Sequence, residues 1–510
     1  MAQEIELKLS VNEQDIEAIK LLPSFNSSQS QPWKSKKVSN YYFDTKNLML
    51  NRSKSALRIR SIDGKYLQTF KTVGLNQGGV HKRDEWEVSL EQADISLDKF
   101  PEAVKTIFSN HSITEEQLIL MFAVEFERET LHITTEEGSQ VEVAIDRGKL
   151  SASEQELPIC ELELELISGH PEALFKLAET ITSQTQAVLD NVSKAEKGFR
   201  LLNQMTFINT AEAMMPSQQE PTVEEALQNA LQHGLQSLLT AESWILHQQP
   251  TEALLAYANA IQFIKHTLSV FSGVISRKAT KPFRDELLWL TESLNDVSTL
   301  SVLDALEKSL ADQKSGWQCP NKSIMHQKIL DEMTFLIKGQ QVLWQEILTS
   351  RRYQMFILRF AHWIQVCGWR SEVKDRSLVY LNQTVLSFAQ KYLSQYLKDL
   401  KHVFAPNKHL SKVDYYDQIA RLEKAMNTGL CFSTLFDATR RKKFRRIWED
   451  ILLGIREMKQ LDRLEKLTQD WDEPDAQEFS QWLERYQKGL NKALIETRRS
   501  ALRLKPYWGN

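Results

Sequence analysis

Cysteine is scarce in this sequence, with four residues in 510. The four stand at positions 160, 319, 367 and 431, so no two of them form a CxxC pair. Zinc sites and disulfide frameworks both depend on cysteines at close or regular spacing. The pattern therefore argues against both, and we expect reduced thiols, which are the rule in cytoplasmic proteins.

Long apolar runs are also lacking. No uninterrupted apolar stretch approaches the roughly 20 residues that a membrane-spanning helix needs. The first residues, MAQEIELKLS, lack the basic and apolar regions of a signal peptide. The net charge of −4 gives no overall attraction to nucleic acid, so any anion site has to be local. We therefore expect a cytoplasmic protein with neither membrane nor nucleic acid among its partners.

The chain is too long for one ordinary domain, and its two halves follow different periods. Residues 1–200 alternate between polar and apolar side chains, whereas residues from about 222 onward follow helical spacing. A polar stretch with two prolines, NTAEAMMPSQQEPT, lies between them. We predict a first domain at 1–205, a linker at 206–221 and a helical domain at 222–510.

The alternating half contains eight strand candidates, with turn sequences such as SIDGKY and TTEEGSQ between consecutive runs. Eight mostly antiparallel strands predict a sheet that closes on itself and leaves no exposed edge. The predicted fold class is α+β, with an N-terminal eight-stranded antiparallel β-barrel tunnel, flanking helices and a C-terminal all-α domain of two repeats. The strands are expected at about 3–11, 37–44, 55–62, 65–74, 79–90, 123–134, 139–150 and 158–167. Helices are expected at 12–22, 99–110, 114–120 and 171–198.

The polar faces of these strands are charged. Arg58 and Arg60 share one face of ALRIRSI, Glu142 and Asp146 share one face of VEVAID, and Arg83 shares a face with the two glutamates of HKRDEWEV. The apolar faces have to be buried, and the helices of this half can cover them from outside. The charged faces then point inward, so we predict that the barrel interior is a polar tunnel.

Two segments carry a carboxylate on every second residue. EIELK contains Glu4 and Glu6, and ELELEL contains the row at 161, 163 and 165. Like charges side by side repel, so a cation between the rows would remove a large cost. Carboxylate oxygens are hard ligands that suit Mg²⁺ or Mn²⁺. The basic side chains of the same strands need an anion, and the planar fork of arginine fits phosphate oxygens. A linear polyphosphate carrying a divalent metal would satisfy both sets.

These motifs resemble the CYTH superfamily, the triphosphate tunnel metalloenzymes. EIELK looks like the ExExK signature of that family, and LRIR, FK, ELELEL and SKAEKGF are similar to its later motifs, in the same order. The resemblance covers about residues 1–202. It implies an eight-stranded antiparallel tunnel that binds triphosphate and needs divalent metal, Mg²⁺ or Mn²⁺.

The resemblance also implies roles for individual residues. Glu4, Glu6 and Lys8 match the catalytic residues of ExExK. The implied metal ligands are Glu4, Glu6, Glu161 and Glu163, with Glu165 as an alternative third carboxylate of its row. The implied substrate-binding residues are Lys8, Arg58, Arg60, Lys71, Arg83, Arg128 and Lys194, with Lys197 as an alternative to Lys194. The expected reaction is hydrolysis of inorganic triphosphate to pyrophosphate and phosphate. Adenylate cyclase, thiamine triphosphatase and a polyphosphate-binding adaptor remain the alternatives.

The helical half contains an internal repeat, because the sequence of residues 271–303 aligns with that of residues 432–464 without a gap. It resembles a CHAD domain, a two-repeat helical module with an affinity for polyphosphate. CHAD domains typically carry histidines and arginines along the first helix of each repeat, whereas TEALLAYANAIQFIKHTL has no histidine before His266 and no arginine. We therefore expect a degenerate module that serves as a scaffold or for docking. Polyphosphate binding through basic stretches such as RRKKFRR (440–446) is the alternative.

Overall fold

The computed structural model describes residues 2–26, 32–72, 74–203, 205–209, 220–247, 251–294, 297–312, 317–373, 375–468 and 471–509. The chain forms two compact units. The first contains Met1–Ile208 together with Glu346–Gly368, and the second contains Asn209–Gln345 together with Trp369–Asn510. Most of the expected linker lies outside the described residues.

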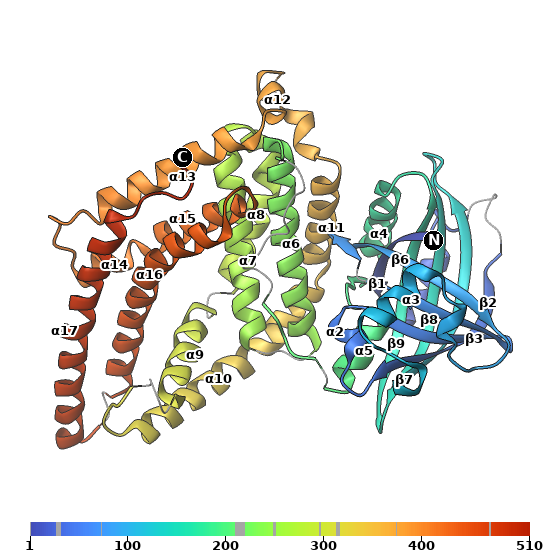
Figure 1. Ribbon diagram of the computed structural model, residues 1–510, viewed down its shortest axis with the longest axis horizontal. Helices are drawn as coiled ribbons and strands as arrows, with labels where there is room; N and C mark the ends of the chain where they lie inside the picture. Colours follow the sequence, from blue (N-terminus) through green and yellow to red (C-terminus); the bar gives the residue numbers. More distant parts are fainter. Residues whose placement is uncertain are drawn as a thin grey trace. The chain divides into compact units, whose positions relative to one another are not determined.

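The first unit is built on a curled antiparallel sheet whose pairing returns to its first strand (Figure 1). Neighbouring strands follow the order β1, β9, β8, β7, β2, β3, β4 and β6, and the first part of β1 pairs with β6. The expected eight antiparallel strands are thereby confirmed. Their bounds are β1 (Ala2–Ser10), β2 (Lys34–Thr45), β3 (Ala56–Ile62), β4 (Lys65–Lys71), β6 (Val80–Leu90), β7 (Leu118–Thr134), β8 (Gln140–Ala152) and β9 (Gln155–Ser168). Two short strands, β5 (Leu75–Gln77) and β10 (Val188–Leu189), pair with β6 and β1.

The apolar faces of the strands are buried on the outside of the ring. Leu7 and Leu9 are fully buried, and helix α4 (Glu172–Gln184) packs against β1 and β9. Elsewhere Phe70 packs with Phe108 of helix α3 (Glu102–Asn110), and Phe122 packs with Phe199 of helix α5 (Lys194–Leu201). Because side chains alternate along a strand, the charged residues between these apolar ones face the interior.

Three helix predictions differ in detail from the structure. The stretch 171–198 forms two helices, α4 and α5, separated by strand β10, whose backbone pairs with β1. Helix α5 begins where the Ser193 hydroxyl accepts the Glu196 N–H at 3.1 Å, a capping bond that fixes its start. The stretch 114–120 forms only a 3₁₀ turn at Glu115–Gln117 before β7 begins. Residues 12–22 form a 3₁₀ turn (Glu13–Asp15) and the short helix α1 (Ile16–Lys20).

The second unit is helical, as expected. Its helices are α6 (Val223–His247), α7 (Thr251–Val270), α8 (Arg277–Ser293), α9 (Val297–Ala311), α10 (Lys322–Thr349, which runs into the first unit), α12 (Asp375–Leu381), α13 (Val385–Val403), α14 (Lys412–Tyr416), α15 (Ile419–Cys431), α16 (Ala438–Leu467) and α17 (Glu473–Arg503). The helices in the described ranges are all too short or too polar to cross a membrane.

The internal repeat is visible in the structure. Ser276 caps α8 and Asp437 caps α16, and these two residues are equivalent in the repeat. The equivalent residues Phe271 and Phe432 are both buried, with ring centroids 5.9 Å apart. The first copy differs in having two helices, α8 and α9, where the second has the single helix α16. The two copies therefore pack on each other through matching residues.

A helix from the second half of the sequence belongs to the first unit. Helix α11 (Arg351–Gln365) packs along α4 (Figure 1). The His362 ring stacks on Phe175 with centroids 5.5 Å apart, and Arg359 pairs with Glu179 at 3.4 Å. The unit that carries the charged barrel is thus completed by residues far along the chain.

Candidate active site inside the barrel

Strand pairing brings the carboxylate rows together. Glu6 of β1 lies opposite Glu165 of β9, which in turn lies opposite Glu142 of β8. Lys8 lies opposite Glu163 in the same ladder. Residues directly opposite in an antiparallel pair share a face, so these charges stand side by side in the interior. The predicted proximity of the two rows is therefore present in the backbone register.

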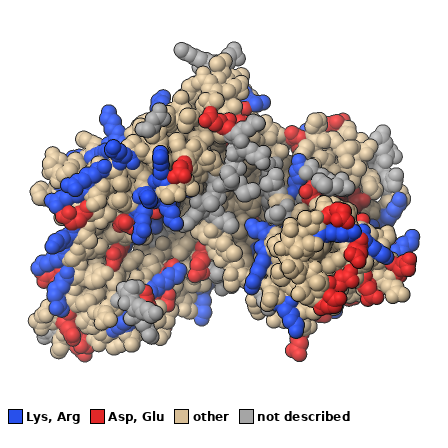
Figure 2. Space-filling view, viewed as in Figure 1, with Lys and Arg blue, Asp and Glu red and all other residues tan. Residues whose placement is uncertain are grey.

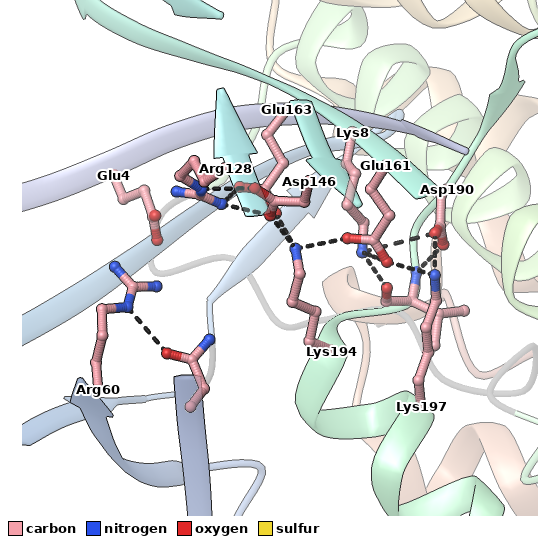
Figure 3. Close-up of polar contacts among 12 residues, drawn as sticks. Glu4, Lys8, Arg60, Arg128, Asp146, Glu161, Glu163, Asp190, Lys194 and Lys197 are labelled. Atoms are coloured by element: carbon pink, nitrogen blue, oxygen red, sulfur yellow. Dashed lines mark hydrogen bonds and ion pairs between the residues drawn. The ribbon is translucent and has the colours of Figure 1, made fainter. Parts of the chain in front are cut away.

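One end of the interior, which we term the lysine end, is closed by α5. Lys194 and Lys197 are three residues apart and lie on one face of this helix. The Lys194 ammonium pairs with Asp146, Glu161 and Glu163 at 2.6–2.7 Å. All of these side chains are mostly or fully buried. The lysine end comprises Lys8, Asp146, Glu161, Glu163, Asp190, Lys194 and Lys197 (Figure 3).

Lys8 and Lys197 share a second buried carboxylate at this end. Lys197 pairs with Asp190 at 2.6 Å and with Glu161 at 2.5 Å. Lys8 lies 3.7 Å from both carboxylates and also donates a hydrogen bond to the Val192 carbonyl. Burial by itself raises the pKa of Glu161, but the ammonium groups, that of Lys194 first, lower it to about 2. The Glu161 carboxylate is therefore ionised, and the carboxylates at this end are already paired with cations.

Arg128 links the lysine end to the rest of the interior. Its guanidinium grips Asp146 through two hydrogen bonds of 2.6 Å and also donates to Glu163. Burial opposes the charge of Arg128, but these two carboxylates raise its pKa well above the usual value. Two parallel hydrogen bonds of this kind fix both the position and the orientation of the Arg128 guanidinium against Asp146.

A second set of side chains surrounds Lys71. The Lys71 ammonium pairs with Glu4 at 2.7 Å and with Glu85 at 3.1 Å, and Arg58 pairs with Glu85 at 3.2 Å. Strands β1, β3, β4 and β6 each contribute to this cluster. The backbone of Arg83 lies in β6 opposite Glu4, whereas its side chain is outside what the structure describes.

Arg60 lies where positive charge is in excess. Its Nε donates to Asn40 at 3.0 Å, and no carboxylate among the described residues forms an ion pair with it. Burial, together with the nearby Arg58 and Arg128, lowers the pKa of Arg60 to about 10. We term Arg58, Arg60 and Arg128 the basic group. An anion placed against the free edge of Arg60 would relieve the repulsion within it.

Glu165 lies where negative charge is in excess. Burial, together with Glu4, Glu142 and Glu6, raises the pKa of Glu165 to about 7. Among the described residues no cation forms an ion pair with Glu165, and Glu142 lies 3.1 Å from the half-exposed His132. We term Glu4, Glu6, Glu142 and Glu165 the acidic group. A cation among these oxygens would remove the repulsion.

Among the described residues, one set of three carboxylates has oxygens close enough together to hold a divalent metal. The oxygens of Asp146, Glu161 and Glu163 lie within 4.8 Å of one another, which is compatible with one ion. That trio, however, is already balanced by Lys194 and Arg128. The acidic group also offers hard oxygens, but no three of its carboxylates, all of them described in the structure, bring oxygens within 4.8 Å of one another, and Glu4 within it pairs with Lys71.

The sequence motifs located most of this cluster. Ion pairs link five of the predicted residues, Lys8, Glu161, Glu163, Arg128 and Lys194. Glu4 and Arg60 lie at the opposite end of the interior from the lysine end (Figure 3). Asp190 was missed, because it follows a strand of only two residues. The alternating pattern pointed to Asp146, and Lys197 was an alternative to Lys194. The contacts of these two residues with the other charged side chains are seen only in the folded structure. On the face drawn in Figure 2, both basic and acidic side chains lie at the surface of each unit.

The chain matches two family models, the CYTH domain over residues 2–199 and the CHAD domain over residues 229–469. An inorganic triphosphatase from Haemophilus influenzae is 32% identical over 202 residues, which are 39% of this chain and 55% of that protein. The chain thus spans about half the length of this curated relative.

Solved structures are similar at lower identity. A candidate adenylyl cyclase from Hippeastrum with a dominant triphosphatase activity is 19% identical, with a TM-score of 0.30, over 40% of this chain and 97% of that one. The CHAD domain from the plant Ricinus communis is 15% identical, with a TM-score of 0.43, over 59% of this chain and 98% of that one. From the family matches, residues 2–199 of this chain are a CYTH domain and residues 229–469 are a CHAD domain.

Proposed function

We propose that this chain hydrolyses inorganic triphosphate to pyrophosphate and phosphate inside the barrel, with Mg²⁺ or Mn²⁺. One observation carries the proposal. Within the part of the chain that the structure describes, the Arg60 guanidinium of the basic group forms no ion pair with a carboxylate, and the Glu165 carboxylate of the acidic group forms none with a cation. A triphosphate with its metal supplies both missing charges at once. The 32% identical inorganic triphosphatase and the metal dependence of CYTH enzymes support this reading.

The proposed role of each basic residue follows from its position in the barrel interior. Arg58, Arg60 and Arg128 bind phosphate oxygens and stabilise the negative charge that spreads over them in the transition state. Lys8 and Lys194 lie at the lysine end, opposite the basic group, and bind the phosphate at that end of the substrate. Their buried carboxylate partners keep both ammonium groups oriented. The substrate is therefore held at both ends before it reacts.

The acidic group is the proposed metal site. Glu4, Glu6, Glu142 and Glu165 would hold the ion, and Glu161 and Glu163 would add ligands only if Lys194 moved away from them. When bound there, a divalent metal would act as a Lewis acid that offsets the negative charge developing on the phosphates and activates water for attack. Lys71 pairs with Glu4 and so keeps one carboxylate of this group in place.

A substrate panel tests the proposal. Phosphate release is measured with inorganic triphosphate, ATP and long-chain polyphosphate, each with Mg²⁺, Mn²⁺ or EDTA. We expect EDTA-sensitive release from triphosphate in preference to the other two substrates. Formation of cyclic AMP and pyrophosphate from ATP would assign the barrel to the cyclase alternative. No turnover of any substrate would refute hydrolysis and favour an adaptor.

A second candidate function, polyphosphate binding by the helical unit, is favoured by one cavity. It has a volume of about 490 Å³ and is lined by Lys408, His409, Lys412, Arg498 and Arg499, among others. Arg498 is buried and donates to the carbonyls of Ala405 and Lys408, which holds the loop that forms the cavity wall. Binding of fluorescent polyphosphate to wild type and to Lys408→Ala tests this. Equal affinities would remove the cavity from consideration.

A further inference from the structure

We propose that Gln354 of α11 is a positioning residue for the lysine end of the barrel, so that the CHAD-matched region supplies a working part of the CYTH unit. The inference rests on the proposed function for its kinetic part. Helix α11 lies within residues 229–469, the range that matches the CHAD model, yet it packs with the barrel. The argument follows the contacts from α11 inward.

Strand β10 is too short to hold its own position. It has two residues, and its pairing with β1 consists of Leu9 with Leu189 and Ser10 with Val188. The Asp190 N–H adds one bond to the Lys8 carbonyl at 2.8 Å. The Leu189 N–H points away from β1, and a buried N–H needs a partner. That partner comes from α11.

Gln354 supplies the partner in one orientation only. Its side-chain oxygen accepts the Leu189 N–H at 2.8 Å, and its side-chain NH₂ donates to the Leu348 carbonyl at 2.6 Å. The residue is fully buried. Turning the amide over would set N–H against N–H and oxygen against oxygen, so both bonds together fix the amide. Gln354 thereby ties β10 to the start of α11.

Asp190, the residue after Leu189, pairs with two lysines of the lysine end. Asp190 pairs with Lys197 at 2.6 Å and with Lys8 at 3.7 Å, and its other oxygen accepts the Val192 N–H at 2.9 Å. Because Asp190 follows Leu189 directly, a displacement of β10 displaces this carboxylate. Lys8 and Lys197 would then lose a shared buried partner. The position of two substrate-end cations therefore depends on Gln354.

The test compares Gln354→Met with Ile357→Val in the full-length protein. Methionine keeps the length of the side chain and removes both hydrogen bonds. Ile357 is fully buried on the same helix, so its loss of a methylene weakens the packing of α11 and leaves both hydrogen bonds of Gln354 in place. Amide hydrogen exchange of residues 186–197 and KM and kcat for triphosphate are measured for both variants.

For Gln354→Met we expect about tenfold faster exchange confined to residues 186–197, since of the two hydrogen bonds removed the one from the Leu189 N–H holds this segment. We also expect KM for triphosphate to rise about fivefold with a smaller change in kcat, by the same loss. Ile357→Val should leave both unchanged. Unaltered exchange at 186–197, an equal response in Ile357→Val, or faster exchange with unaltered KM would each overturn the positioning role.

The two proposals fail in distinguishable ways. If wild-type protein releases no phosphate from triphosphate, the proposed function is wrong. In that case the exchange measurement still decides whether Gln354 holds β10, because it needs no substrate. If wild type is active and Gln354→Met is kinetically identical to it, the positioning role alone is wrong.

Discussion

Lys194 offers the sharpest test of the buried charge network. Lys194→Met keeps most of the stem of the side chain and removes the ammonium, whose nitrogen lies 5.3 Å from the centroid of the Phe126 ring. Three carboxylates with oxygens within 4.8 Å of one another then lose a shared cation. Removing one partner of a buried ion pair typically costs about 3–5 kcal/mol. Arg128 remains beside two of the three, so we take the lower end, about 3 kcal/mol.

Calorimetry of the first unit measures this loss. Each kcal/mol shifts the Tm of a unit of this size by about 2–4 °C, so Lys194→Met in EDTA should unfold about 6–12 °C below wild type. Mg²⁺ should recover part of the loss, because the trio then has the geometry and the charge to hold the ion. Lys176→Met is the matched control, since Lys176 is half-exposed and pairs with the exposed Glu137. Exposed pairs contribute about 0–1 kcal/mol. Equal Tm values for the two variants would refute the reasoning.

Three further substitutions test separate parts of the account. Arg60→Ala should raise KM for triphosphate about tenfold or more, because a phosphate-binding guanidinium is lost. Tm should stay within about 2 °C of wild type, because Arg60 lacks a carboxylate partner among the described residues and its loss relieves repulsion. Steady-state kinetics and calorimetry check this, and an unchanged KM would contradict it. Glu6→Ala should abolish turnover without lowering Tm in EDTA, and retained turnover would sink its place in the metal site. Burial and two lysines lower the pKa of His266 to about 4, and the neutral ring accepts a hydrogen bond from Asn427 at 2.7 Å. Because the folded pKa lies below the unfolded value of about 6.5, this stability is present above pH 6.5 and is lost as pH falls toward 4, by up to about 3 kcal/mol. Urea unfolding of the helical unit should show that loss in wild type and not in His266→Gln, and identical pH profiles would disprove the assignment.

The barrel was predictable because its signal is local. Alternation of Leu7 and Leu9 with charged neighbours fixes which face is buried, and eight such runs leave few ways to satisfy the strand edges. The same alternation placed Arg58, Arg60 and the carboxylate rows inside. The alternation therefore predicted which charged residues face the interior, and the resemblance to the CYTH family implied their ligands.

What the sequence did not reveal depends on contacts between distant segments. Asp190 follows a two-residue strand whose position is set by β1 on one side and by Gln354, 165 residues later, on the other. No periodicity encodes such a contact. The balance of charge is equally non-local, since Glu163 and Glu165 belong to one motif. The first is neutralised by Lys194 and Arg128, while burial and neighbouring carboxylates raise the pKa of the second.

The central claim is that triphosphate and a divalent metal together supply the charges that the interior lacks. A ³¹P NMR time course of triphosphate with full-length protein tests it most directly, because it identifies every product. The account predicts pyrophosphate and phosphate in equal amounts with Mg²⁺ or Mn²⁺, and no change in EDTA. Persistence of the triphosphate signals with both metals, or equal loss in EDTA, would contradict it.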